Sequence, residues 1–186
     1  MNRLGKMLNH FWREEQGSVM VEALLVLPAM IWAYAGMFAY WDSYQSINTV
    51  QKATFTVSDL ISRQQDDLNS GFINGIGDTL DYLLNMEEDA KLRVTSYTWS
   101  EVNNRYQVIW SVSPDGGFSP LTTASIADLT SRLPIMSDGD SAVLVESSVY
   151  HTPPIQFGLD PSNIEQFVVA RPRYLPKICH VDFDCG

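Results

Sequence analysis

The densest group of chemically versatile side chains lies at the C-terminus of this chain. The run CHVDFDC at residues 179–185 brings two thiols, one imidazole and two carboxylates together. All three kinds of group bind zinc, but the spacing of this run corresponds to no standard zinc site. Asp182 and Asp184, like Asp138 and Asp140, offer oxygens to calcium, which takes six or more; short Asp-x-Asp runs, however, are common in solvated turns. We therefore expect neither a metal nor another cofactor.

Catalytic side chains show no recognisable grouping elsewhere. Histidine, the usual general base, occurs three times, as His10, His151 and His180. The chain has no Gly-x-Ser-x-Gly, no His-Glu-x-x-His and no phosphate-binding loop. We therefore expect that this protein is not an enzyme.

A carboxylate next to an apolar segment is the remaining unusual feature. Glu22 directly precedes residues 23–41, which carry no charged side chain. A helix of these 19 residues is roughly 28 Å long, close to the hydrocarbon thickness of a bilayer. Tyr40 and Trp41 lie at its end, where aromatic side chains commonly mark the membrane interface. We therefore predict a transmembrane helix over residues 18–41.

Two alternatives to a transmembrane helix follow from the same residues. One is a buried core helix, although core helices of this length usually keep a polar face. The other is a cleaved secretory signal, because residues 33–36 have the small-x-small pattern Ala-Tyr-Ala-Gly. Glu22, Pro28 and the length of the apolar run argue against a signal peptide. Pro28 itself is most simply explained as a kink, because proline removes one helical hydrogen bond.

The charge distribution bears on which molecules the protein binds and on its orientation in a membrane. The formal net charge is −10, and an acidic surface repels phosphate backbones, so we expect no nucleic-acid partner. Residues 1–17 contain three basic and two acidic side chains, so the acidic excess lies after them. A weakly basic leader in front of an apolar helix suits an N-terminus that stays in the cytoplasm.

Beyond residue 41 the apolar residues become one-sided, and strand patterns follow. A helix is predicted over about residues 18–66, because apolar or β-branched side chains recur every three or four positions at 44, 47, 50, 54, 57 and 61. Three glycines in residues 69–77 are expected to separate it from a short helix that begins at Asp78. Strands are expected over 92–100, 105–113, 142–151 and 166–174, and a short helix over 122–133. The predicted fold is α+β: a long N-terminal helix packed on a mostly antiparallel sheet. Aromatic side chains on the strands are expected in the core rather than in a ligand platform, namely Tyr97, Trp99, Tyr106 and Trp110.

The N-terminal residues resemble a known family. Gly-Ser-Val-Met-Val-Glu, at residues 17–22, resembles the type IV prepilin pattern. The longer stretch EEQGSVMVEALLVLP, at residues 14–28, is similar to the TadE-like pseudopilins of tight-adherence (Tad/Flp) pilus systems, in which a Leu-Val-Leu-Pro-like run follows the glutamate. Ala23 takes the place of the aromatic residue that members often have. The resemblance covers residues 11–40 and not the rest of the chain.

This resemblance implies a processed membrane protein with a pilin-like fold. A prepilin peptidase would cleave after Gly17, so residues 1–17 would be a cytoplasmic leader peptide and Ser18 the first residue of the mature chain. Residues 18–41 would anchor it in the bacterial inner membrane, with 42–186 in the periplasm or in the pilus. It would be a minor pilin or pseudopilin that assembles, initiates or caps an adhesive Tad/Flp pilus. Its partners would be the peptidase, other minor pilins or pseudopilins, and the major pilin.

Cleavage would also explain Glu22. A carboxylate inside the bilayer costs about 2.5–3.5 kcal/mol and persists there only when a partner neutralises it. The amine of Ser18, in the same subunit or a neighbour, would be that partner, and the pair would set the axial register of the subunits. A kink at Pro28 would matter when the subunit leaves the membrane during assembly. The simpler alternative is an interfacial carboxylate that favours the helix dipole by about 0.3–1 kcal/mol.

The two cysteines, Cys179 and Cys185, are expected to form a disulfide. An oxidising compartment favours this pairing in an exported domain. Many type IV pilins carry a C-terminal disulfide loop, so the resemblance implies the same pair. The main functional alternative is a membrane-anchored periplasmic module that is not processed as a pilin and binds a ligand with residues 92–113 and nearby loops.

Overall fold

The computed structural model describes residues 16–84, 90–155 and 157–185. They belong to two compact units: the chain up to Ser43 with Pro153–Asp160, and Tyr44–Thr152 with Pro161–Gly186. Helix α2 (Gln16–Ser62) contributes its N-terminal part to the first unit and its C-terminal part to the second. The fold class predicted from the sequence, α+β with a long N-terminal helix and an antiparallel sheet, is confirmed.

In the second unit, α2 buries one face and exposes the others. Val50, Val57 and Ile61 are fully buried, as the predicted three- and four-residue spacing requires. Tyr44 and Ile47 belong to the same predicted stripe but are 65% and 45% exposed, because the core of this unit begins only at Val50. The helix ends at Ser62, four residues before the predicted end near 66.

Helix α3 (Ser70–Leu84) corrects the prediction that the glycine-rich stretch 69–77 separates two helices. Its cap is Asn69 rather than Asp78, since the Asn69 side-chain oxygen accepts a hydrogen bond from the Phe72 amide (2.8 Å). Glycine costs a helix about 1 kcal/mol relative to alanine. Burial of a regularly spaced apolar face outweighs that cost; its residues are Ile73, Ile76, Leu80 and Leu84.

Four antiparallel strands form one sheet in the order β2-β1-β3-β4. The strands are β1 (Lys91–Ser100), β2 (Arg105–Val112), β3 (Ser141–His151) and β4 (Ser162–Ala170). The first three agree with the predicted strands to within a residue or two. β4 begins and ends four residues earlier than predicted, because pairing with β3 places Ile164 opposite Val149. A left-handed residue, Asn104 (φ 47°), closes the β1–β2 hairpin.

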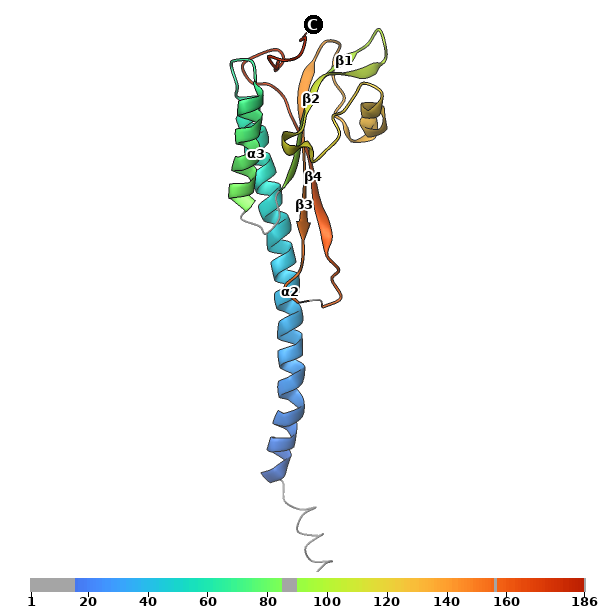
Figure 1. Cartoon of the computed structure of the whole chain (residues 1–186). Helices are drawn as coiled ribbons and strands as arrows, with labels where there is room; N and C mark the ends of the chain where they lie inside the picture. Colours follow the sequence, from blue (N-terminus) through green and yellow to red (C-terminus); the bar gives the residue numbers. More distant parts are fainter. Residues whose placement is uncertain (1–15, 85–89, 156, 186) are drawn as a thin grey trace, which may run out of the picture. The chain divides into compact units, whose positions relative to one another are not determined.

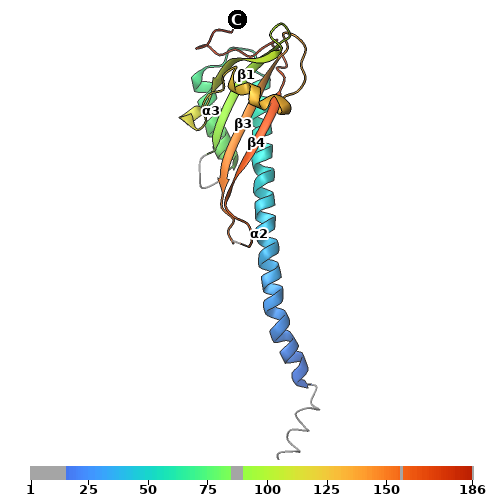
Figure 2. The same cartoon turned by 90° about the vertical axis from the view of Figure 1, so that its right-hand side faces the viewer.

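The sheet of the second unit has a core on each face. Helices α2 and α3 cover one face, and the segment with the short 3-10 helix η2 (Ser125–Arg132) covers the other (Figures 1 and 2). The predicted helix at 122–133 is therefore present as a 3-10 helix. The second 3-10 helix, η1 (Pro114–Gly116), lies against α3 instead, with Pro114 next to Gly77. On the helix side the core includes Leu92, Val94, Trp110, Val143 and Val145. On the other side it includes Tyr97, Tyr106, Leu121, Ile126, Leu144 and Met136.

Hydroxyl groups lie buried between α2 and the sheet. The hydroxyls of Thr54 and Ser147 are 2.7 Å apart, and the Thr54 hydroxyl also lies 2.8 Å from the Val50 carbonyl oxygen. Both side chains are almost fully buried. The pair links the helix directly to β3, so it opposes sliding of the helix along the sheet.

Candidate functional site

The predicted processing and register residues all lie in α2. Gly17 and Ser18 are part of its first described turn, and Pro28 lies inside it without ending it. Because proline has no amide hydrogen, the carbonyl of Leu24 lacks its usual helical partner at this point. Glu22 is exposed on the helix surface. Ser18 and Glu22 are four residues apart, which places them on the same helix face. Most of the predicted leader, residues 1–15, lies outside the described residues.

The N-terminal part of α2 is long and apolar enough to cross a membrane. Its large side chains are exposed in every direction, including Leu24, Leu25, Met30 and Ile31. A helix that is apolar all round needs an apolar environment, either lipid or partner helices. The predicted interfacial side chains, Tyr40 and Trp41, are exposed as well, and so are Trp32 and Tyr34 earlier in the segment.

One contact to this helix could not be predicted from the sequence. The loop between β3 and β4 places the Phe157 ring against Trp32, with ring centroids 4.7 Å apart. Phe157 also lies over Gly36, where an added Cβ would come within 2.7 Å of the ring. The sequence signal for this contact is weak: residues 153–159 carry no charge, and a contact between positions so far apart leaves no local pattern.

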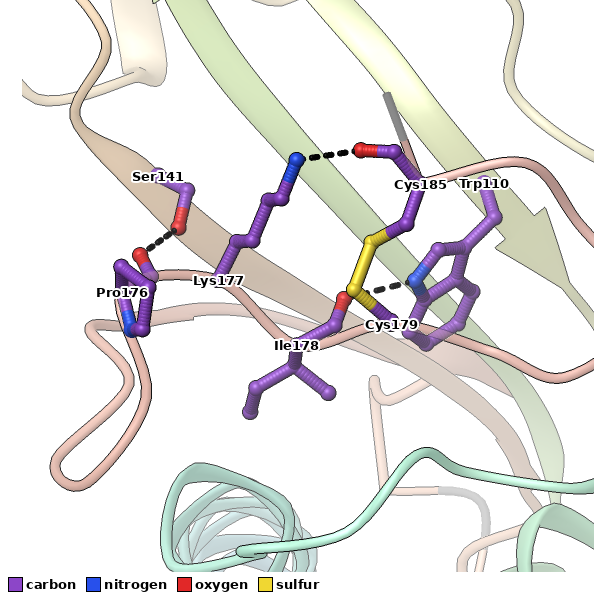
Figure 3. Close-up of a disulfide and its surroundings, with 7 residues drawn as sticks. All are labelled: Trp110, Ser141, Pro176, Lys177, Ile178, Cys179 and Cys185. Atoms are coloured by element: carbon purple, nitrogen blue, oxygen red, sulfur yellow. Dashed lines mark hydrogen bonds between the residues drawn. A yellow bond between two sulfur atoms is a disulfide. The ribbon is translucent and has the colours of Figure 1, made fainter.

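The C-terminal segment contains the disulfide loop and is held to the sheet by hydrogen bonds to its main chain (Figure 3). Cys179 and Cys185 are joined, with 5.6 Å between their Cα atoms. The Trp110 indole donates a hydrogen bond to the Ile178 carbonyl (2.8 Å), and Ser141 donates to the Pro176 carbonyl (2.6 Å). This segment thus crosses from β3 to β2 and covers the buried indole.

A short parallel bridge ties the same segment to the α2–α3 connection. The Leu68 amide donates to the Cys179 carbonyl (2.9 Å), and the Val181 amide donates to the Leu68 carbonyl (2.8 Å). His180 is almost fully buried, with its ring near those of Trp110 and Phe183. Its Nδ1 accepts a hydrogen bond from the Asp182 amide (3.2 Å). His180 therefore fills space beneath the disulfide loop.

The residues considered as metal ligands have structural partners. Both cysteines are in the disulfide. Asp138 accepts a hydrogen bond from the Glu101 amide (2.7 Å), and Asp140 accepts one from the Ser137 amide (3.2 Å). Across residues 16–84, 90–155 and 157–185, no three His, Cys, Asp or Glu side chains are grouped so that they could hold a metal.

The strand aromatics are core residues rather than an open platform. Tyr97 is fully buried, its ring meets Tyr106 edge-on, and the Tyr106 hydroxyl donates to the Pro134 carbonyl (2.7 Å). Burial raises the pKa of the Tyr97 hydroxyl well above its usual value of 10.0, and the nearby Tyr106 adds to the increase. Burial also raises the pKa of Tyr106.

An open cavity lies beside the disulfide loop. Its volume is about 540 Å³, and it is lined by β1 and β2 on one side and by the C-terminal segment on the other. Polar side chains reach it from both sides, among them Thr98, Gln107 and Asp184. Part of its lining comes from residues 92–113, the region that the sequence suggested for a ligand-binding module.

We compared the chain with known proteins, and no family model, no curated protein and no solved structure matches it.

Proposed function

We propose that this chain is a TadE-like minor pilin or pseudopilin. In this proposal a prepilin peptidase removes residues 1–17, and the mature chain begins at Ser18. Residues 18–41 anchor it in the bacterial inner membrane, with the N-terminus cytoplasmic and 42–186 periplasmic. It acts in the assembly, initiation or capping of a Tad/Flp pilus, together with other minor pilins and the major pilin.

One observation carries this proposal. The Gly17-to-Glu22 pattern occupies the start of a single helix whose N-terminal part is apolar all round and whose C-terminal part packs on an antiparallel sheet. A helix that is apolar all round is unfavourable in water, and a carboxylate inside the bilayer is costly unless a partner neutralises it. The sheet-bearing domain supports a minor role, because a bulk subunit of a thin fibre of this class needs little more than the helix.

The helical spacing supports a specific role for Glu22. Cleavage after Gly17 creates an amine at Ser18, one turn from Glu22 on the same face. This cation can neutralise the carboxylate of its own subunit or of an adjacent one. A subunit in the wrong axial register would leave a charge alone in the membrane, at a cost of about 2.5–3.5 kcal/mol. The pair therefore favours one register.

Processing is tested by producing the full chain with and without prepilin peptidase and measuring its intact mass. The expected change is the loss of residues 1–17, with Ser18 as the new N-terminus. A first residue at Gly36 would identify a secretory signal instead. A chain that keeps residues 1–17 in its native cell would refute the pilin proposal and leave an anchored domain.

The register role is tested with Glu22→Gln. We expect this variant to be processed normally but to lose crosslinking to other pilus subunits through the 18–41 helices. Glu165→Gln, which removes an exposed carboxylate from β4, is the matched control and should crosslink as the unaltered protein does. Normal crosslinking by Glu22→Gln would exclude the pairing role.

The second candidate is a membrane-anchored module that binds a small ligand. The cavity of about 540 Å³ beside β1 and β2 favours it, because binding sites for small molecules commonly have this size. The processing experiment separates the two functions: an unprocessed chain that retains a ligand after purification would support the binding module.

A further inference from the structure

The β3–β4 connection contains an apolar loop in the first unit. Residues 153–159 have no charged side chain, and Ile155, Phe157 and Leu159 alternate along it. Ile155 is exposed, whereas Phe157 and Leu159 are half-buried. Exposed apolar surface of this kind commonly marks a contact with a protein or a membrane.

The loop meets α2 inside the segment expected to cross the membrane. Phe157 packs between Trp32 and the face of Gly36, and both Gly36 and Ala39 are buried. A side chain at position 36 would displace the ring, since even a Cβ would lie 2.7 Å from it. Glycine is therefore the residue that lets the loop approach at this level of the helix.

The irregular backbone of the loop limits how deep in the membrane the loop and Gly36 can lie. Among the described residues of the loop, the one hydrogen bond between backbone groups runs from the Phe157 amide to the Ile155 carbonyl (2.9 Å). Gly158 has a left-handed φ of 74°, so the loop is neither helix nor strand. Lipid-exposed irregular backbone does not occur in the hydrocarbon region, because its polar groups would have no partners there. The backbone of the loop, and the part of α2 around Gly36 that it contacts, must therefore lie where water or lipid headgroups are within reach.

We propose that this loop is a membrane-interface element, with Ile155 and Phe157 inserted among the lipid headgroups at the C-terminal boundary of the span. The hydrocarbon span is then residues 18–36 rather than 23–41. Ser18–Gly36 also contains 19 residues, roughly 28 Å of helix, so it fits the same thickness. Trp41 then lies above the hydrocarbon.

The shifted span changes the surroundings of Glu22. It places Ser18 at the opposite boundary and Glu22 about 6 Å inside it, within reach of a Ser18 amine. The partner is lipid rather than another subunit, because residues 153–159 carry no charge and are continuous with the surface of the span itself, and the charge of the loop begins only at Asp160. This inference rests on membrane anchoring, which both proposed functions share.

Depth measurements on the full chain test this inference. A nitroxide is attached to a cysteine introduced as Ile155→Cys, with the native disulfide intact, in vesicles of phosphatidylethanolamine and phosphatidylglycerol. Leu25→Cys, in the apolar part of α2, and Val102→Cys, at the exposed hairpin, provide the references for lipid and water. We expect the label at 155 to lose most of its accessibility to a water-soluble nickel chelate relative to 102, and to be less accessible to oxygen than the label at 25. Equal nickel accessibility at 155 and 102 would overturn the proposal.

A second variant tests whether Gly36 positions the loop. Gly36→Leu fills the place of the Phe157 ring and should return the label at 155 to the accessibility of 102. Gly75→Leu is the matched control, because an added Cβ on this helical glycine meets nothing within 4 Å; it should leave the label unchanged. An unchanged label in Gly36→Leu would contradict the positioning role.

Two further outcomes would show whether membrane anchoring, or the choice of lipid as the partner of the loop, is wrong. If the label at 25 is also open to the nickel chelate, membrane anchoring itself fails. If protection at 155 disappears as the protein is diluted with lipid, a second copy covers the loop, and the lipid assignment is wrong. Processing at Ser18 is measured independently by mass, so its failure does not affect the depth result.

Discussion

The buried hydroxyl pair between α2 and β3 makes a quantitative prediction about how the helix is held on the sheet. Thr54→Val keeps the shape of the side chain and removes its hydroxyl. The Ser147 hydroxyl, buried and bonded to Thr54, then loses the partner shown in the structure. An unpaired buried hydroxyl costs about 1–3 kcal/mol, and we expect a loss of unfolding free energy in this range.

The partner substitution has a smaller effect. Ser147→Ala leaves Thr54 bonded to the Val50 carbonyl, so no donor is stranded. The expected loss is about 0.5–1.5 kcal/mol, the net value of one hydrogen bond. In the double variant neither hydroxyl remains, and replacing both partners by apolar groups is often nearly neutral. Adding Ser147→Ala to Thr54→Val should therefore restore stability.

The assay is urea unfolding of the full chain in detergent micelles, followed by tryptophan fluorescence and extrapolated to zero denaturant. Thr56→Val, which makes the same change at an exposed helix position, is the control and should cost less than about 0.5 kcal/mol. If Ser147→Ala destabilises the Thr54→Val variant as much as it destabilises the unaltered chain, the two hydroxyls are not coupled. The hydroxyl pair would then contribute nothing to holding α2 on the sheet.

Three further predictions concern the globular unit. Reduction of the disulfide should lower the unfolding free energy by about 2 kcal/mol, because it opens a seven-residue loop; urea unfolding with and without reductant measures this. Arg93→Met should cost about 1–3 kcal/mol, because Arg93 and its carboxylate partner are each only 13% exposed. Arg173→Met should cost less than about 1 kcal/mol, because the side chains of Arg173 and its partner Asp59 are 54% and 38% exposed. Folding raises the pKa of Tyr97, so the folded chain keeps this proton at a higher pH than the unfolded chain. The contribution of Tyr97 to the unfolding free energy is therefore complete below the pKa of the unfolded chain, near 10.0, and is lost as the pH rises from there toward the pKa of the folded chain. Melting temperatures in alkaline buffers should therefore fall less for Tyr97→Phe than for the unaltered chain, and Tyr82→Phe, at an exposed tyrosine, should behave as the unaltered chain.

Features that depend on neighbouring residues were predictable from the sequence. An uncharged run of 19 residues identifies an apolar helix whatever surrounds it. Alternation in residues 92–113 identifies the first hairpin, because side chains alternate between the faces of a strand. The two cysteines are close in sequence, so their approach to disulfide distance requires little from the rest of the fold.

Features that depend on partners distant in the sequence were not predictable. Three glycines indicated a break in 69–77, yet α3 runs through them because its apolar face is buried against the core. The ends of β4 follow from its register with β3, which no signal within β4 specifies.

The sequence by itself determined the long apolar helix and the first three strands, because those properties arise from the chemistry of adjacent side chains. Only the tertiary structure decided that Phe157 packs on Gly36, that Thr54 meets Ser147 and that a cavity opens beside the disulfide loop. The physical reason is that such contacts join positions separated by many residues. Their energy depends on the shape of the whole surrounding unit rather than on any local pattern.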